Sequence, residues 1–177
     1  MIERGTAIVL IGFMGMGKSS VGQLLAERTG WRKFDTDELV AAKFALPIAE
    51  IFARFGEDRF RDAETSALRE LPREGDSIVV TGGGTILRAK NVQLLREIGT
   101  IVCLNADEER LFERLASRRN RPLLQTSDPR ATMKELLRSR ETIYKKAADI
   151  MIDTSDLTHE EVADEVIKEL KTLSVQR

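Results

Sequence analysis

The stretch Ile8–Gly22, with the sequence IVLIGFMGMGKSSVG, decides the fold because an apolar run leads directly into a glycine-rich loop. Within it, Gly12–Ser19 match the pattern G-x-x-x-x-G-K-[ST], in which glycines let the backbone curl with its N–H groups pointing inward. An apolar β-branched strand precedes the loop and an amphipathic helix follows it, so a polyphosphate can lie at the positive end of that helix. The stretch therefore predicts a P-loop that binds a nucleoside triphosphate.

The polar side chains that close this loop have separate expected roles. We expect Lys18 to reach the β and γ phosphates as a point charge, and the Ser19 hydroxyl to ligate Mg²⁺. The alternative is a plain strand, turn and helix with a surface lysine, which the loop and its context together disfavour. The residues expected to contact the nucleotide here are Gly12, Met14, Gly15, Met16, Gly17, Lys18, Ser19 and Ser20.

Composition and charge narrow the class of protein. The chain has 177 residues, which suits a single domain with a sizeable core, and 42% of them are hydrophobic. Its 28 Lys and Arg residues nearly balance its 29 Asp and Glu residues, so no overall field attracts nucleic acid or an anionic membrane. The single cysteine, Cys103, lies in the apolar run TIVCLN, which favours a buried thiol in a reducing compartment.

The N-terminal sequence imitates a secretory signal, because Arg4 precedes an apolar stretch. That stretch is interrupted by Gly12 and runs into Lys18 without a small-residue cleavage site. Elsewhere in the sequence, no window approaches the ~20 apolar residues of a membrane span. We therefore expect a cytoplasmic protein without a membrane partner.

Short apolar runs alternate with longer amphipathic stretches, a pattern typical of a parallel sheet with helical crossovers. The sequence predicts an α/β fold of three layers, α/β/α, around a five-stranded parallel sheet. Gly30 is expected to end the first helix, Asp128 with Pro129 to begin the helix over 129–147, and Thr158 with Glu161 to form a capping box. The expected strands cover residues 7–11, 32–35, 77–81, 100–104 and 149–153, and the expected helices cover 17–29, 36–44, 47–55, 57–71, 88–97, 107–118, 129–147 and 158–172.

Two segments are not accounted for by single crossover helices. Residues 36–71 hold several short helices between the second and third strands, and insertions of this kind often carry a substrate site. Residues 117–128, SRRNRPLLQTSD, are charged and form the candidate lid, which suits a small kinase that must exclude water. We expect one domain over 1–177, with its core in 1–35, 72–116 and 129–177.

Two carboxylates follow the second strand in the sequence FDTDE. Asp35 and Asp37 are two residues apart, so in an extended chain both point toward the carboxyl edge of the sheet, where α/β proteins bind ligands. Asp35 is placed to hold the metal, and Asp37 to accept a hydrogen bond, and the proton, from a substrate hydroxyl. The alternative is an N-cap pair that opens the next helix; the neighbouring P-loop favours the functional interpretation.

The segment GEDRFRDAE puts Arg61 and Glu64 three residues apart on one helical face. A pair of this kind is ordinarily a surface ion pair of little energetic value. Phe52, Phe55 and Phe60 are expected to cluster around it, and an arginine held by an acid beside aromatic rings is a suitable fork for a substrate carboxylate.

Glycines and arginines complete the set of candidates. Three consecutive glycines in Thr81–Thr85, TGGGT, suggest that a ligand packs directly on the backbone, although a structural bend remains an alternative. Arg118, Arg119 and Arg121 lie in the candidate lid, and Arg140 lies in RETIYKKAAD. A lid arginine can stabilise the charge of a transferring phosphoryl group, whereas RNA binding is disfavoured because no aromatic residues lie between these arginines.

Taken together, these motifs are similar to those of the shikimate kinases, within the nucleoside-monophosphate-kinase-like group of P-loop folds. The resemblance covers nearly the whole chain and rests on GFMGMGKSSVG, FDTD, GEDRFRDAE, VVTGGG, RPLL and RETIY in the family's order. It implies a P-loop kinase fold with a substrate-binding insert and a short lid. The implied reaction transfers the γ-phosphate of ATP, with Mg²⁺, to the 3-hydroxyl of shikimate.

The resemblance also implies a role for each matched residue. Lys18 and Ser19 would serve the phosphates and Mg²⁺, Asp35 the metal, and Asp37 the substrate hydroxyls as the candidate base. The remaining residues would bind substrate or close the site: Arg61 and Arg140 on the shikimate carboxylate, Gly82, Gly83 and Gly84 against the substrate, Arg121 on the γ-phosphate, and Arg118 or Arg119 on the adenine.

This chain departs from the family in two places. It reads KFALPIAEIF where the family usually has a glycine before this helix, and its loop between Ser117 and Arg121 is short. The nearest rival function is another small-molecule kinase of this fold, such as a gluconate kinase. A relative that binds ligands without catalysis is a second rival, disfavoured because every matched lysine, aspartate and arginine is present. We expect a monomer.

Overall fold

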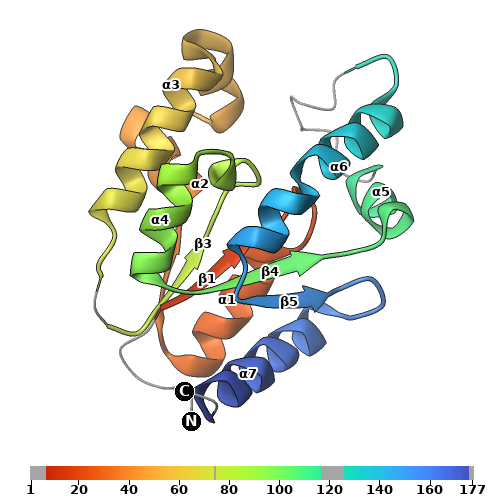
Figure 1. Cartoon of the computed structure of the whole chain (residues 1–177). Helices are drawn as coiled ribbons and strands as arrows, with labels where there is room; N and C mark the ends of the chain where they lie inside the picture. Colours follow the sequence, from red (N-terminus) through yellow and green to blue (C-terminus); the bar gives the residue numbers. More distant parts are fainter. Residues whose placement is uncertain (1–6, 74, 117–125, 176–177) are drawn as a thin grey trace.

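The computed structural model describes residues 7–73, 75–116 and 126–175, which form a five-stranded parallel sheet with helices on both faces (Figure 1). The strand order is β2-β3-β1-β4-β5, so the connections from β1 to β2 and from β3 to β4 each pass over a strand that lies between them in the sheet. Helical crossovers are what a parallel sheet requires. The strands are β1 (Ala7–Ile11), β2 (Arg32–Asp35), β3 (Ser77–Val80), β4 (Gly99–Asn105) and β5 (Ile150–Asp153).

Strand β1 lies in the middle of the sheet and every one of its residues is buried. Leu10 pairs in parallel register with Val80 on one side and Val102 on the other. A strand that is covered on both faces reads as a continuous apolar run rather than an alternating one. This explains why the run before the P-loop is entirely apolar.

Helices cover both faces of the sheet, as the sequence predicts. Figure 1 shows α1 and α7 on one side of the sheet and α4 and α6 on the other. The insert and the remaining crossover supply the other helices around the carboxyl edge. The helices are α1 (Lys18–Thr29), α2 (Thr36–Phe44), α3 (Ile48–Glu70), α4 (Ala89–Ile98), α5 (Glu108–Ala116), α6 (Pro129–Ala147) and α7 (His159–Val175), and a 3-10 turn, η1, covers Thr85–Leu87.

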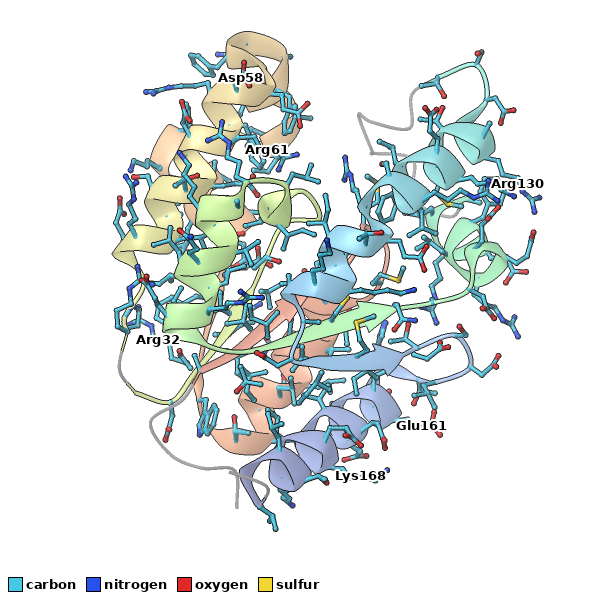
Figure 2. All side chains as sticks on the ribbon, viewed as in Figure 1. Arg32, Asp58, Arg61, Arg130, Glu161 and Lys168 are labelled. Carbon is cyan, nitrogen blue, oxygen red and sulfur yellow. The ribbon has the colours of Figure 1, made fainter. Side chains whose placement is uncertain are left out.

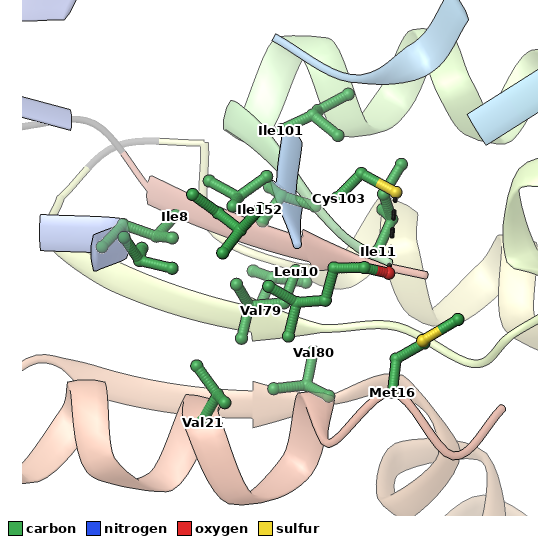
Figure 3. Close-up of a cluster of buried hydrophobic side chains, with 14 of the residues drawn as sticks. Ile8, Leu10, Ile11, Met16, Val21, Val79, Val80, Ile101, Cys103 and Ile152 are labelled. Atoms are coloured by element: carbon green, nitrogen blue, oxygen red, sulfur yellow. Dashed lines mark hydrogen bonds between the residues drawn. The ribbon is translucent and has the colours of Figure 1, made fainter. Parts of the chain in front are cut away.

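The main core forms between α1 and the central strands. Leu10, Val21 and Val80 meet there with less than 2% of each side chain exposed (Figure 3). A Cβ on Gly22 would clash with the side chain of Val80, so a glycine is needed for α1 to approach β3 this closely. The close approach fixes the helix start, and with it the P-loop, against the sheet.

Three helix ends have the caps that the sequence predicts. Gly30 ends α1 in the left-handed region, with φ 74°. The Asp128 carboxylate accepts a hydrogen bond from the Ala131 N–H at 3.0 Å and caps α6. Thr158 and Glu161 bond reciprocally: the Glu161 N–H donates to the Thr158 hydroxyl, and the Thr158 N–H donates to the Glu161 carboxylate.

The boundaries differ from the sequence prediction in several places. The two helices expected over 47–55 and 57–71 form α3, but Gly56 (φ 79°, ψ 170°) breaks its helical backbone, so the predicted interruption is confirmed. Strand β4 is longer than expected because Gly99 already pairs with Ala7, where a side chain would collide with the Ala7 backbone. The turn η1 was not predicted, since three residues carry no periodicity.

The insert has a small hydrophobic cluster of its own between α2 and α3. Its buried members come from both helices and are separate from the main core. The two helices of the insert are therefore packed against each other around a core of their own. The buried members of the cluster are Val40, Ile51, Phe60, Ala63 and Ala67. Among the helices of the described ranges, none is long and apolar enough to cross a membrane.

Candidate active site

The carboxyl ends of β1, β2 and β3 bring the P-loop, the two aspartates and the glycine run to one edge of the sheet. Two adjoining cavities lie there, of about 100 and 80 Å³. The larger one is lined by insert residues together with Arg140, and the smaller one by the P-loop. Both cavities share Met14, Asp37, Gly82 and Gly83, so Asp37 lies at their boundary.

The P-loop has the curled backbone that its glycines predict. Gly15 and Gly17 have φ values of 84° and 83°, a region that other residues rarely adopt. The Lys18 ammonium is 8% exposed and donates to the carbonyls of Gly12 at 2.8 Å and Phe13 at 3.0 Å. The lysine therefore lies across its own loop, beside the cavity where phosphates are expected. No side chain caps α1 at Gly17, which leaves its N-terminal dipole directed at this cavity.

Asp35 uses its two carboxylate oxygens for different contacts. One of its oxygens accepts a hydrogen bond from the Asp37 N–H at 3.0 Å and caps α2, as the structural alternative predicts. The other oxygen accepts from the Ser19 hydroxyl at 3.3 Å, which joins β2 to the P-loop. A hydroxyl and a carboxylate beside a phosphate cradle are the hard oxygen ligands that Mg²⁺ prefers, so these two residues fit a magnesium ion.

Asp37 is a half-buried carboxylate in an environment that disfavours its charge. Burial, followed by the negative charges of Glu64 and Asp35, raises its pKa to about 6, and the opposing charges of Lys18 and Arg61 only partly offset this. Its Oδ1 is buried without a hydrogen-bond partner among the described residues. A buried acceptor of this kind is costly unless a ligand supplies the missing donor.

Arg61 is held by two acids, and the surface ion pair considered from the sequence is wrong because Glu64 is fully buried. Its Nη1 donates to Glu64 at 2.5 Å, and its Nε and Nη2 both donate to Glu57, at 3.2 and 2.9 Å. A guanidinium has five N–H groups, so these bonds to Glu57 and Glu64 leave two, one on each terminal nitrogen, for which the described residues show no further bond. Figure 2 shows Arg61 on the inner side of α3, whereas Asp58 points outward.

The three glycines are required, but mainly by the protein's own groups. A Cβ on Gly82 would come within 2.7 Å of both the Asp37 and the Glu64 carboxylates, and one on Gly84 would clash with the Arg61 guanidinium. The protein's own side chains therefore give a reason for glycine at Gly82 and Gly84, and the packing of a ligand on this backbone stays a prediction. Without a Cβ at these positions, the charged side chains of the site can pack directly against the backbone. All three glycines also line the larger cavity.

Two of the three predicted phenylalanines lie at the site. The rings of Phe52 and Phe60 are 4.6 Å apart and line the larger cavity, and the Arg61 guanidinium lies 5.2 Å from the Phe60 ring. The prediction for Phe55 is wrong: its side chain is 49% exposed and pairs with Phe44 outside the cavity. Phe55 directly precedes the break at Gly56, so it does not share the inward face of the following helical segment.

Helix α6 contributes a second arginine to the larger cavity. Arg140 is 6% exposed and lies 5.7 Å from the Phe13 ring of the P-loop. One turn later, the Tyr144 hydroxyl donates to the carbonyl of Gly83. Tyr144, which the sequence analysis did not single out, lines neither site cavity but holds the glycine run through this bond. Its spacing of four from Arg140 places both residues on one helical face. Burial raises the pKa of this phenol, so it stays a donor.

Other residues that the sequence analysis singled out lie away from the two site cavities or outside the described residues. Met16 lines a separate cavity of about 290 Å³ between α6 and the ends of β4 and β5, and it is not among the residues that line the P-loop cavity. Cys103 lines the same cavity, and burial raises its thiol pKa to about 12, which confirms a buried, unreactive residue. Arg118, Arg119 and Arg121 lie outside the described residues, as do residues 117–125 of the candidate lid.

Comparisons with known proteins agree with this geometry. The sequence profile of the shikimate kinase family matches residues 14–171. The shikimate kinase of Thermodesulfovibrio yellowstonii is 47% identical over 94% of this chain and 96% of its own length, and that of Geobacter sulfurreducens is 43% identical over 92% and 89%.

Solved structures show the same relationship. Shikimate kinase from Acinetobacter baumannii, in complex with shikimate, superposes with a TM-score of 0.89 at 34% identity and covers 94% of this chain and 93% of its own. A gluconokinase from Sinorhizobium meliloti has a TM-score of 0.62 at 20% identity, which shows a shared fold alone. On the family profile and on identities above 40% across nearly the full length, this chain belongs to the shikimate kinase family.

Proposed function

We propose that this chain transfers the γ-phosphate of ATP to the 3-hydroxyl of shikimate and gives 3-phosphoshikimate and ADP. ATP is the co-substrate of the family to which the chain belongs. The observation that carries the proposal is the position of Asp37 between a phosphate cradle and a pocket with two buried arginines. A donor group and an acceptor hydroxyl can meet there, at a buried oxygen that has no partner among the described residues.

The larger cavity supports binding of a small polyhydroxylated acid. Arg61 has two N–H groups left after its bonds to Glu57 and Glu64, one on each terminal nitrogen, and they can bind the two oxygens of a carboxylate. Arg140 adds a second positive charge, which compensates the acids that already surround Arg61. Phe52 and Phe60 offer an apolar wall for the ring. With the acid bound in this cavity, Gly82, Gly83 and Gly84 would pack against it.

Asp37 is proposed to accept the hydrogen bond of the attacking hydroxyl. Its pKa of about 6 leaves it ionised at neutral pH and able to accept a proton. Phosphoryl transfer passes through a loose transition state in which positioning and charge neutralisation dominate. Asp37 therefore need not be a strong base; holding the hydroxyl in line with the transferring phosphorus is its main contribution.

The P-loop residues are proposed to bind the triphosphate. Lys18 would exchange the carbonyls of Gly12 and Phe13 for the β and γ phosphates, which are stronger partners for an ammonium group. Ser19 and Asp35 would hold Mg²⁺, which neutralises phosphate charge when bound. We extend the proposal to Arg121 at the γ-phosphate and Arg118 at the adenine, within a lid over residues 117–128.

Charge and chain length support further properties of the protein. The near balance of charge supports a protein without a nucleic-acid partner. We propose a cytoplasmic monomer with a single domain, in which residues 36–71 form the substrate-binding insert. Sedimentation of the purified protein at micromolar concentration tests the monomer directly.

One experiment tests the reaction. ATP turnover is measured by release of ADP, with shikimate, with gluconate and with no acceptor, and the product's phosphate position is read by NMR. We expect turnover that depends on shikimate and a phosphate on its 3-oxygen. Turnover with gluconate but not shikimate favours the rival kinase, and binding of ATP without turnover favours a non-catalytic relative.

A further inference from the structure

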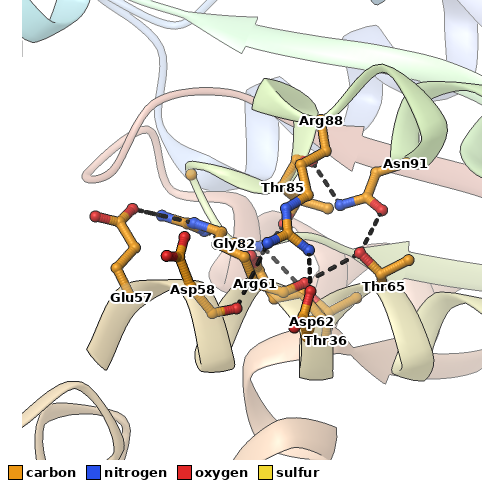
Figure 4. Close-up of polar contacts among 12 residues, drawn as sticks. Thr36, Glu57, Asp58, Arg61, Asp62, Thr65, Gly82, Thr85, Arg88 and Asn91 are labelled. Atoms are coloured by element: carbon orange, nitrogen blue, oxygen red, sulfur yellow. Dashed lines mark hydrogen bonds and ion pairs between the residues drawn. The ribbon is translucent and has the colours of Figure 1, made fainter. Parts of the chain in front are cut away.

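A buried chain of hydrogen bonds lies behind the acid-binding pocket and joins three elements (Figure 4). It begins at Asn91 on α4, passes through Thr85 on η1, and ends at Glu64 and Arg61 on α3. Asn91, Thr85 and Glu64 are each fully buried, so the polar atoms of these three side chains have no contact with water. Buried polar groups are retained at a cost, which raises the question of what this chain achieves.

Asn91 uses both ends of its amide within the protein. Its Nδ2 donates to the carbonyl of Thr85 at 2.9 Å, and its Oδ1 accepts from the Thr65 hydroxyl at 2.8 Å. The first bond fixes the backbone of η1, which follows the glycine run directly. The second bond ties the same side chain to α3. Asn91 therefore fixes the distance between the helix that carries Arg61 and the turn that carries Thr85.

Thr85 continues the chain through its side chain. Its hydroxyl donates to one oxygen of Glu64 at 2.6 Å, while the other oxygen of Glu64 accepts from Nη1 of Arg61 at 2.5 Å. Both oxygens of this buried carboxylate are thus fixed by different donors. Without the Thr85 hydroxyl, Arg61 would be the one remaining donor to the Glu64 carboxylate among the described residues, and that carboxylate could turn. Arg61 would keep its bonds to Glu57 but would lose a fixed partner at Nη1, so its guanidinium would be held less firmly at the cavity.

We propose that Thr85 and Asn91 are positioning residues for the substrate carboxylate. Asn91 fixes η1, Thr85 fixes Glu64, and Glu64 orients the guanidinium of Arg61. Neither Thr85 nor Asn91 lines the larger cavity, so their effect is transmitted through Glu64 and Arg61. The inference rests on the proposed function, because it assumes that Arg61 binds the carboxylate of the acceptor.

The decisive comparison is between two substitutions of Thr85. Thr85→Val keeps the shape of the side chain and removes the hydroxyl, whereas Thr85→Ser keeps the hydroxyl. We expect Thr85→Val to raise KM for shikimate about tenfold, with KM for ATP changed less than about twofold. Thr85→Ser is expected to stay within about threefold of the unsubstituted protein in both constants. A purely structural role would not separate the two KM values in this way.

Asn91→Ala tests the far end of the chain, and Gln93→Ala, an exposed position on the same helix, is its control. We expect Asn91→Ala to raise KM for shikimate about fivefold, and to add less than about twofold in a Thr85→Val background, because both act through Glu64. Gln93→Ala is expected to change neither constant. If Asn91→Ala does not fold, the Thr85 pair decides alone.

The outcomes are distinguishable from failure of the proposed function. Absence of shikimate turnover in the unsubstituted protein contradicts the function itself. Normal turnover, together with an unchanged KM for shikimate in Thr85→Val, contradicts only the positioning role. Equal losses in Thr85→Val and Thr85→Ser would also overturn it, since the hydroxyl would then not be the group that matters.

Discussion

The surroundings of Asp37 make its charged form less stable, and the same surroundings serve the proposed reaction. Its carboxylate is crowded by Glu64 and Asp35, its pKa is raised to about 6, and one oxygen has no partner among the described residues. Each feature makes the ionised form less stable in the folded chain than in water. Each also keeps the oxygen available for a substrate hydroxyl.

The first prediction concerns pH and activity. We expect kcat/KM for shikimate to fall as pH decreases through about 6, because protonation of Asp37 removes the acceptor of the hydroxyl proton. A pH profile between 5 and 8 at saturating ATP measures it, with the coupling enzymes checked separately at each pH. A profile that is flat from pH 7 down to pH 5 would contradict this assignment.

The second prediction concerns pH and stability. Because the folded pKa of Asp37 lies above that of an unfolded Asp, the folded state binds this proton more tightly, and stability is lost as pH rises through about 6. Asp37→Asn should therefore abolish most turnover yet raise the free energy of unfolding by about 1–3 kcal/mol at pH 8. Urea unfolding at pH 8 and pH 5 measures it, and the gain should shrink at pH 5.

The third prediction uses Gly84, whose φ of −109° suits an alanine. An added Cβ would collide with the Arg61 guanidinium, so Gly84→Ala should displace this group while the backbone keeps its conformation. We expect KM for shikimate to rise about tenfold or more and KM for ATP to change little. Steady-state kinetics with each substrate varied in turn decide it; equal changes in both KM values would contradict a local effect.

Short local patterns made part of the site predictable. Lys18, Ser19 and the two aspartates lie within a loop and a strand end, and the structure brings all four together. The partner of Thr85 is 21 residues away and that of Asn91 is 26 residues away, so no local spacing indicates either contact. The direction of Phe55 was missed because a break at Gly56 resets the helical phase.

At the scale of elements, the turn between α2 and α3 contains the segment KFALPIAEIF, where the resemblance to the family leads us to expect a glycine. Ala45 follows α2 with φ 52°, the one described non-glycine residue with a positive φ. The sequence showed that a glycine was missing from this region, but not which residue would take the left-handed conformation. Pro47 then begins α3 with its fixed φ, so the turn has little freedom to relax.

The fourth prediction follows from that strain. Ala45→Gly should stabilise the protein by about 0.5–1 kcal/mol, because the left-handed region costs an alanine more than a glycine. Ala42→Gly, an exposed position inside α2, is the matched control and should destabilise by about 0.5–1 kcal/mol. Thermal unfolding of both variants measures it; destabilisation by both would show that Ala45 is not strained.

At the scale of the molecule, the fold is more predictable than the site. All five strands were expected from the sequence. The central strands β1, β3 and β4 are apolar runs because the sheet buries both of their faces, whereas the edge strands β2 and β5 are partly exposed. Strand order is a tertiary property, yet β3-β1-β4 at its centre places the P-loop between the insert and α6. The two cavities consequently meet at Asp37 although their linings come from distant segments.

The last prediction tests whether the P-loop cavity acts on phosphoryl transfer and the larger cavity on binding of shikimate. Lys18 lines only the P-loop cavity, and Arg61 lines only the larger one. Lys18→Ala should mainly lower kcat, by about 10²-fold or more, because the charge it neutralises develops on the transferring phosphate. Arg61→Ala should mainly raise KM for shikimate, by about 10-fold or more, because it removes binding that ground state and transition state share. Initial rates over a grid of both substrates separate the constants, and circular dichroism confirms folding. Equal losses of kcat and KM in both variants would mean that the cavities act as one site.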